Sequence, residues 1–186
     1  SNTAVGASAL AGTNTAGENV GIGYQSLYTN TSGLNNTAVG SYSMYSATSA
    51  QSNVGVGKNA LYYDTTGSYN TAIGGIALYS NTTASYNTAV GYQALYTGTT
   101  AADNTAVGYQ AGYVTTGSSN AFFGTSAGVA NTTQNVNFSA FGISFDIKSF
   151  SSSSLQTATE IGTALVLLNT GTNVGAGRFV VSQGAN

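Results

Sequence analysis

Polar and apolar positions recur along this chain with a period of 17 residues. The period is anchored by the glycine that closes the motif Asn-Thr-Ala-Val-Gly, which stands at Gly6, Gly23, Gly40, Gly57, Gly74, Gly91 and Gly108. Two degenerate copies follow and end at Gly124 and Gly142. A fixed period of this length indicates a repeat architecture in which each unit packs mainly on its neighbours.

Each repeat predicts two short strands separated by turns. Before the motif glycine, Thr or Val, then Ala or Gly, then Val or Ile alternate with the period of two that is typical of a strand. Four residues after the glycine comes a column of Leu or Met, followed by a column of Tyr, and Gln93–Thr97 shows this second expected strand. The remainder is Thr, Ser, Asn and Gly, which is turn chemistry. A helix is disfavoured because Gly, Asn and β-branched residues are poor helix formers.

The sequence therefore predicts an all-β fold, a β-solenoid or parallel β-roll of 17-residue coils. Residues 1–142 form about nine repeats, with the Val/Ile and Leu/Met columns inside and Asn, Thr and Tyr in ladders of like residues. The Ala/Gly column then faces outward and suits close approach of another backbone. We expect it to be a self-association stripe formed by Ala38, Gly55, Ala72, Ala89 and Ala106.

The period stops after Gly142, and residues 143–186 are expected to be a β-rich C-terminal segment. Ala164–Leu168 and Arg178–Ser182 are typical of strands, whereas Thr157–Leu168 also fits a short helix. A solenoid needs a terminal cap over its last coil. The segment is interpreted as such a cap or, alternatively, as a docking element for the next subunit.

The repeat resembles known fibre proteins. Asn19–Gly23 and Asn53–Gly57 are similar to the head repeat of trimeric autotransporter adhesins, and Asn87–Tyr96 resembles arrays in bacteriophage tail fibres. The resemblance covers residues 1 to about 142 and implies a left-handed parallel β-roll of three chains in the shaft or head of a fibre. The adhesin repeat is shorter than 17 residues, so its turn geometry does not carry over.

The amino-acid composition disfavours several classes of functional site. Charged residues make up 4% of the chain, the net charge is −2, and Cys and His are absent, which disfavours disulfide frameworks, zinc sites and histidine catalysis. Three cations provide no basic surface for nucleic acid. We also expect no membrane insertion, because apolar runs are short. The first residues are already repeat sequence, so the chain is expected to be processed or a fragment.

The acidic residues do not predict an enzyme. Glu18 and Asp103 share a column but lie five coils apart, about 24 Å at strand spacing, and Asp64 falls in a different turn. Paired catalytic carboxylates are typically within about 10 Å. Ser149 beside Lys148 is a poor dyad because neighbours on a strand face opposite ways. We expect no enzymatic activity, cofactor or metal.

Aromatic columns give the one binding signal. Tyr24, Tyr92 and Tyr109 share a column that could stack on a glycan or envelope polymer. The alternative is that the tyrosines, including the column from Tyr28 to Tyr113, stack on each other and stabilise the solenoid.

The leading hypothesis is a self-associating structural subunit of a fibre or filament, as a homotrimer or open filament, located outside the cell, on its surface or on a virion. The second hypothesis is a receptor- or glycan-binding adhesin module. The third is an ice-binding solenoid, which the interruption of the Thr column by Val20 and Val54 disfavours.

Overall fold

The computed structural model describes residues 1–12, 17–129 and 138–139, all within one compact unit, Ser1–Lys148. The expected cap or docking segment, 143–186, lies outside the described residues. So do the alternatives of helix and strand for 155–168, and the Lys148–Ser149 pair.

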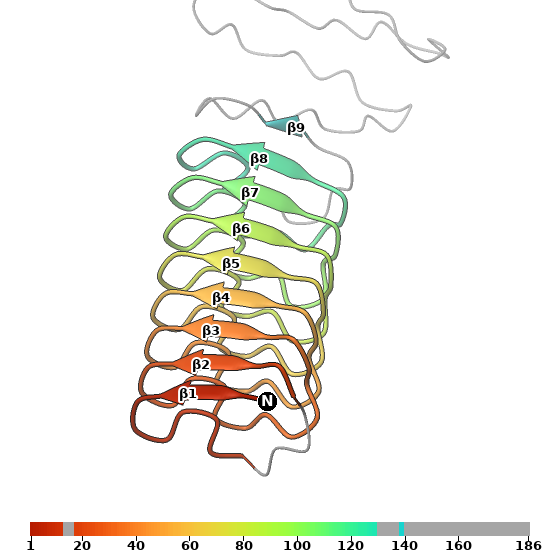
Figure 1. The fold of residues 1–186 in the computed structure, drawn as a ribbon. Coiled ribbons are helices and arrows are strands. Elements are labelled where there is room, and N and C mark those ends of the chain that lie inside the picture. Colours follow the sequence, from red (N-terminus) through yellow and green to blue (C-terminus); the bar gives the residue numbers. More distant parts are fainter. Residues whose placement is uncertain (13–16, 130–137, 140–186) are drawn as a thin grey trace, which may run out of the picture. The chain divides into compact units, whose positions relative to one another are not determined.

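Each coil contributes one strand to a single parallel sheet (Figure 1). The strands are β1 Thr3–Val5, β2 Val20–Ile22, β3 Thr37–Val39, β4 Val54–Val56, β5 Thr71–Ile73, β6 Thr88–Val90, β7 Thr105–Val107, β8 Ala121–Phe123 and β9 Phe138–Ser139. They pair in sequence order, and Thr71 lies opposite Thr88 and Ile73 opposite Val90, one period apart. The predicted β-solenoid of about 17 residues per coil is confirmed.

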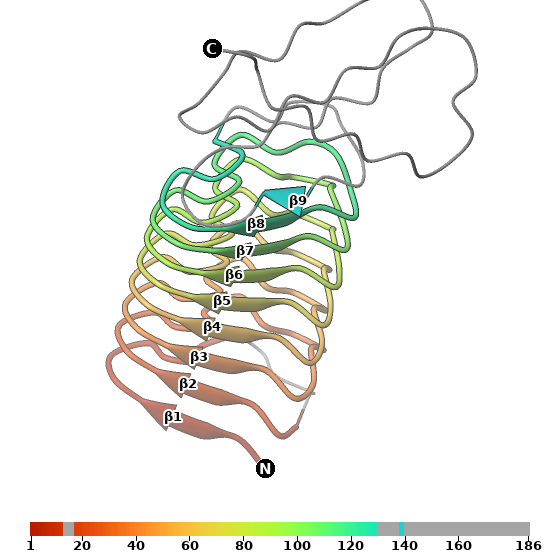
Figure 2. The same cartoon turned by 90° about the horizontal axis from the view of Figure 1, so that it is seen from above.

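The second expected strand is wrong. Gln93–Thr97 and its equivalents form turns, and the strands of the coils lie along one side only (Figure 2). Gln93 and Leu95 both have positive φ, 57° and 50°, with the residue between them outside that region. With this alternation of φ, backbone N–H groups of the turn still point to the next coil, since Leu95 N donates to Ala111 O at 2.9 Å. Leucine in a left-handed conformation is uncommon, and sequence alone favoured a strand because Leu and Tyr are common there.

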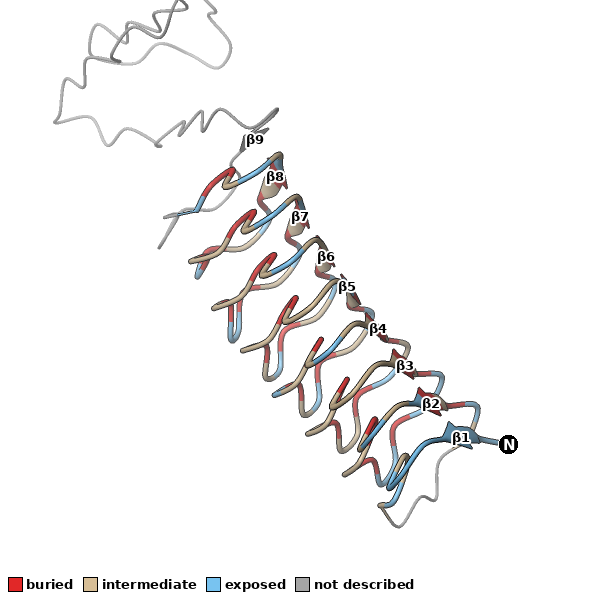
Figure 3. Ribbon diagram, turned by 90° about the vertical axis from the view of Figure 1, so that its left-hand side faces the viewer, coloured by how far each residue is buried: buried red, intermediate tan, exposed pale blue. Residues whose placement is uncertain are grey.

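The interior is the reverse of the expected one for the strand residues. The middle residue of β3, β5, β6 and β7 is a fully buried alanine, whereas Ile73 remains 42% exposed. The buried sections therefore line the inside of successive coils (Figure 3). The leucine and methionine column is buried as predicted: Leu27, Met44, Leu61, Leu78 and Leu95.

The narrowness of the coil explains this reversal. A Cβ added at Gly55 would come within 2.7 Å of Ser43 Oγ and 3.0 Å of Met44 Cγ, so the space beside Met44 hardly admits a methyl group. Valine does not fit where alanine barely does, and it faces outward instead. The predicted self-association stripe, Ala38, Gly55, Ala72, Ala89 and Ala106, is buried core and is wrong as a surface.

Buried asparagines link the coils, as the expected ladder required. Asn70 N donates to Asn53 Oδ1 at 2.7 Å, and Asn87 N donates to Asn70 Oδ1 at 3.0 Å. Asn70 Nδ2 donates to Ala84 O at 2.8 Å across the coil. One side chain thus accepts from the next coil and ties the strand to the turn 14 residues later. These hydrogen bonds provide partners for polar groups that would otherwise be buried without one.

The motif glycine is required by conformation and by space. Gly40 has φ 131°, a region that L-residues rarely adopt, and a Cβ there would lie 2.6 Å from Gly57 O in the next coil. At the motif glycine, the backbones of successive coils therefore approach too closely to admit a side chain.

Candidate functional site

The outward side of the sheet is a continuous uncharged surface, which we call the outer sheet face. It consists of the first and third residues of β1–β8: Thr3, Val20, Thr37, Val54, Thr71, Thr88, Thr105, Ala121, Val5, Ile22, Val39, Val56, Ile73, Val90, Val107 and Phe123. Val5, Ile22, Ile73, Val107 and Phe123 are exposed by 55, 38, 42, 37 and 37%. The face thus presents hydroxyl and apolar groups in parallel columns.

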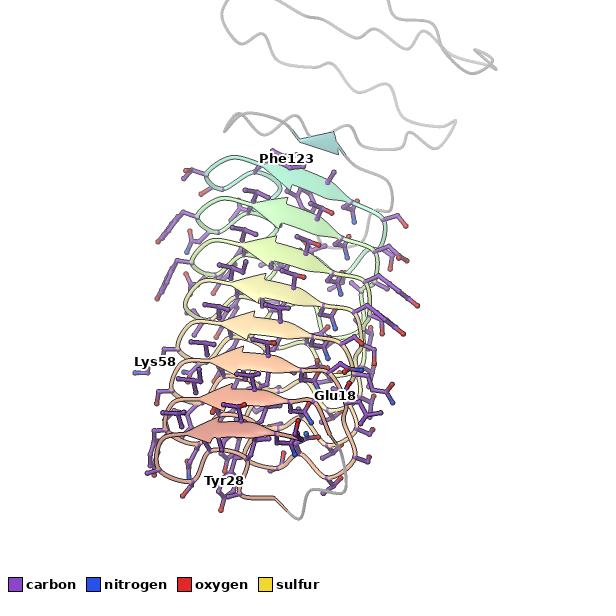
Figure 4. The ribbon with its side chains drawn as sticks, in the orientation of Figure 1. Glu18, Tyr28, Lys58 and Phe123 are labelled. Atoms are coloured by element: carbon purple, nitrogen blue, oxygen red, sulfur yellow. The ribbon has the colours of Figure 1, made fainter. Side chains whose placement is uncertain are left out.

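Charged side chains of the described residues lie off this face. Lys58 follows the glycine after β4 and points away at the turn, and Glu18 precedes β2 (Figure 4). Asp103 occupies the same position before β7 as Glu18 does before β2. Electrostatic repulsion between two copies of the outer sheet face is therefore negligible.

A second surface is built from tyrosines on the turns. The tyrosine ladder, Tyr28, Tyr45, Tyr62, Tyr79, Tyr96 and Tyr113, stacks ring on ring with centroids 5.3, 5.1, 5.4, 5.3 and 5.0 Å apart. Its rings are half-buried, and each interior ring has both faces covered by its neighbours. What remains accessible is ring edges and phenol groups.

The three tyrosines expected to bind a ligand do not form one site. Tyr92 and Tyr109 stack at 5.8 Å and are 49 and 50% exposed, but Tyr24 lies four coils before Tyr92 and pairs edge-on with Tyr42 at 5.2 Å. Ser41, Lys58 and Gly75 interrupt their column. A Cβ added at Gly75 would lie 3.4 Å from the Tyr92 ring, so that ring packs over the glycine.

Three tyrosines of this region hold their phenolic protons more tightly than a free phenol does. The pKa of Tyr79 is raised to about 12, mainly by desolvation and to a smaller extent by the neighbouring phenols. The pKa values of Tyr42 and Tyr62 are also raised. A hydrogen bond with Tyr63 contributes to the raised pKa of Tyr79. The phenols therefore act as neutral donors and acceptors rather than as nucleophiles.

Residues that could bind a metal ion are not clustered in the described part of the chain. No three His, Cys, Asp or Glu residues there are grouped to hold a metal ion. The ranges described also contain no helix long and apolar enough to cross a membrane.

The burial of one carboxyl group was not predicted from the sequence. Asp64 is fully buried, and its Oδ2 atom has no hydrogen-bond partner. The signal was present, because Asp64 occupies a column in which Asn30 and Asn81 stand at the equivalent position.

Comparison of the chain with protein-family models, curated proteins and solved structures found no match.

Proposed function

We propose that this chain is a structural subunit of a fibre or filament, extracellular or borne on a virion, and that copies associate through the outer sheet face. One observation carries the proposal: β-branched apolar side chains point outward in coil after coil while the interior is filled by Ala and Leu. A large exposed apolar surface is typical of a protein–protein interface.

The outer sheet face suits a second copy of itself. It repeats with the coil spacing along its length, so two or three parallel copies bring equivalent rungs to the same level. Thr hydroxyls beside Val and Ile supply the mixture of apolar area and hydrogen-bonding groups found at stable interfaces. This face takes the place of the Ala/Gly stripe, which is buried.

Charge placed on the outer sheet face tests the proposal. In the triple variant Ile73→Glu, Val90→Glu and Val107→Glu the side chains point outward, so the coils remain folded while the copies repel each other. We expect wild type to sediment as an oligomer and the variant as a monomer with an unchanged circular dichroism spectrum.

The matched control places the same three charges on exposed turns, as Thr66→Glu, Thr83→Glu and Thr100→Glu. This control is expected to keep the oligomer. A monomeric wild type, or an outer-face variant that assembles like wild type, would refute association through this face.

The adhesin alternative depends on Tyr92 and Tyr109, which are half exposed. Stacking on sugars requires a free ring face. Tyr92 and Tyr109 each cover one face of the other, and the Tyr92 ring also packs over Gly75. This geometry favours a structural role for the tyrosines. Glycan-array binding that disappears in Tyr92→Ala/Tyr109→Ala would instead support the adhesin function.

A further inference from the structure

A buried column of turn residues runs through the solenoid seven positions after each motif glycine. Its members are Asn30, Ala47, Asp64, Asn81, Gly98 and Thr115, and all are buried. Asp64 is the one acidic residue among them. An acid in this interior must either find donors for both oxygens or bind a proton.

Asn30 shows how an amide side chain forms hydrogen bonds at this position. Gly33 N donates to Asn30 Oδ1 at 2.9 Å, and Asn30 Nδ2 donates to Gly33 O at 3.1 Å. Asn81 Nδ2 likewise donates to Ala84 O at 3.1 Å. The two asparagines of this column thus donate to the carbonyl three residues later.

Asp64 reproduces only the accepting half of this pattern. Gly67 N donates to Asp64 Oδ1 at 2.9 Å, as Gly33 N does to Asn30. Asn81 Nδ2 donates to the same oxygen at 3.2 Å, whereas Oδ2 has no partner. An ionised carboxyl group has no hydrogen to donate to Gly67 O, the equivalent of the carbonyl that Asn30 binds.

We propose that Asp64 is a buried proton-binding site, at which the folded solenoid takes one proton from solvent and holds it on Oδ2. The resulting O–H donates to Gly67 O, as the amide of Asn30 donates to Gly33 O. The neutral acid is then a structural equivalent of asparagine, and both of its oxygens are satisfied. Folding is thereby coupled to the uptake of a proton.

The surroundings contain no charge that would stabilise the ionised form. The other charged side chains of the described residues, Glu18, Lys58 and Asp103, are exposed. Tyr63, which precedes Asp64 in the sequence, is 46% exposed. Burial raises the pKa of Asp64 to about 8, and the hydrogen bonds from Gly67 and Asn81 only partly oppose this.

The sign of the pH dependence follows from linkage. The unfolded chain loses the proton near the ordinary pKa of 3.8, whereas the folded chain keeps it to about pH 8. The stabilisation is complete below about pH 4 and is lost as the pH rises to about 8. Within this window the unfolding equilibrium constant increases by up to about tenfold per pH unit.

Urea unfolding of wild type and Asp64→Asn between pH 4.5 and 8.5 tests the proposal. Wild type is expected to lose stability steadily over this range. Asp64→Asn carries a permanent donor and should remove that slope while keeping the fold. Equal slopes in the two proteins would overturn the proposal.

Two matched variants separate this effect from general charge effects. Asn30→Asp places a second acid in an equivalent position and should steepen the slope. Asp103→Asn removes an exposed carboxylate and should leave the slope unchanged. The reverse ranking of these two variants would count against a proton site in the buried column.

A direct measurement does not depend on whether any variant folds. The chain has three aspartates, Asp64, Asp103 and Asp146, so ¹³C labelling at Asp Cγ gives few signals to assign. At pH 6 one signal of the folded wild type is expected at the shift of a neutral acid. Three carboxylate signals at pH 6 would overturn the proposal.

Discussion

At the scale of single residues, volume rather than hydrophobicity decides which side chains lie inside. The 17-residue coil encloses so little space that alanine occupies the strand positions facing leucine, and valine remains outside. Close packing penalises an added methylene in such a core as well as a deleted one. The stability of the solenoid therefore depends more on its alanines than on its valines.

Neighbouring residues of β6 test this ranking. Ala89→Ile places three extra carbons in the closed interior and should destabilise by about 1–3 kcal/mol or more. Val90→Thr changes a half-buried outward residue and should shift the free energy of unfolding by about 0.5 kcal/mol or less in the monomer. Urea unfolding of both variants in the double-variant background Ile73→Glu/Val107→Glu, with Val90 otherwise unchanged, measures the two losses without interference from assembly. A larger loss for Val90→Thr would contradict the inside-out assignment.

The asparagine ladder is the second determinant at this scale. Asn70→Ala leaves Asn87 N without its partner, whereas Ala84 O keeps the hydrogen bond from Asn81 Nδ2. An unsatisfied buried group costs about 1–3 kcal/mol, so a loss of about 1–3 kcal/mol is expected in urea unfolding. Thr83→Ala, on an exposed turn, is the control and should be nearly neutral. Comparable small losses in both variants would show that the ladder contributes little.

At the scale of elements, the strand is short and the turns do much of the bonding. Three residues per coil form the sheet, while turn amides such as Leu61 N, which donates to Ala77 O at 3.0 Å, continue the bonding around the perimeter. Threonine side chains extend this bonding, since Thr65 Oγ1 donates to Thr82 O at 2.9 Å. The coil is thus held on every side by its neighbours.

The glycine that ends each strand is the least replaceable element boundary. Gly40→Ala combines an unfavourable φ with a contact between the new Cβ and Gly57 O. A loss of at least about 2 kcal/mol is expected, since strained backbone alone costs about 1–3 kcal/mol. Thermal unfolding of Gly40→Ala beside Gly75→Ala, where the added Cβ meets only the Tyr92 ring at 3.4 Å, measures the difference. Equal melting temperatures would mean that the backbone spacing at Gly40 can relax.

The sequence predicted the elements unevenly, for identifiable reasons. The 17-residue period fixed the parallel register, because identical columns pair only when each coil lies on the next. Alternation in Thr88–Val90 divided the residues between two faces but did not say which face is inside. The turn at Leu95 escaped prediction because a left-handed leucine has no sequence signature.

The candidate site residues were likewise predicted only in part. Tyr92 and Tyr109 were correctly placed in one column, but their separation from Tyr24 depends on what fills the coils between. Asp64 was missed because its lone charge was compared with other carboxylates rather than with Asn30 in its own column. Equivalent positions in the repeat predict which side chains are neighbours, but only the structure shows which of them are buried.

At the scale of the whole described unit, one coil shows where length can vary. The coil from Gly108 to Gly124 has 16 residues, yet Asn120 N still donates to Asn104 Oδ1 at 3.0 Å. Only Thr116 separates the buried Thr115 and Gly117, whereas Thr82 and Thr83 separate the buried Asn81 and Ala84. The missing residue thus belongs to this turn.

Three deletions compare the tolerated site with the strand. Removing Thr83 should lower the melting temperature by only a few degrees, because the turn shortens as it does at Thr116. Removing Ala72 shifts Ile73 toward the interior and should abolish cooperative unfolding of the neighbouring coils. Removing residues 70–86, a whole period, should give a shorter folded solenoid. Circular dichroism melting distinguishes these outcomes, and equal effects of the first two deletions would contradict them.

Hydrogen bonds that run from coil to coil also determine how the solenoid responds to force. A pull along the stack loads the contacts between successive coils in series, so the weakest junction opens first and its neighbours follow. Each released coil of 17 residues extends by at most about 3.3–3.6 Å per residue, giving steps of roughly 55–60 Å. Such a chain is expected to lengthen under tension in small increments rather than to break apart in one event.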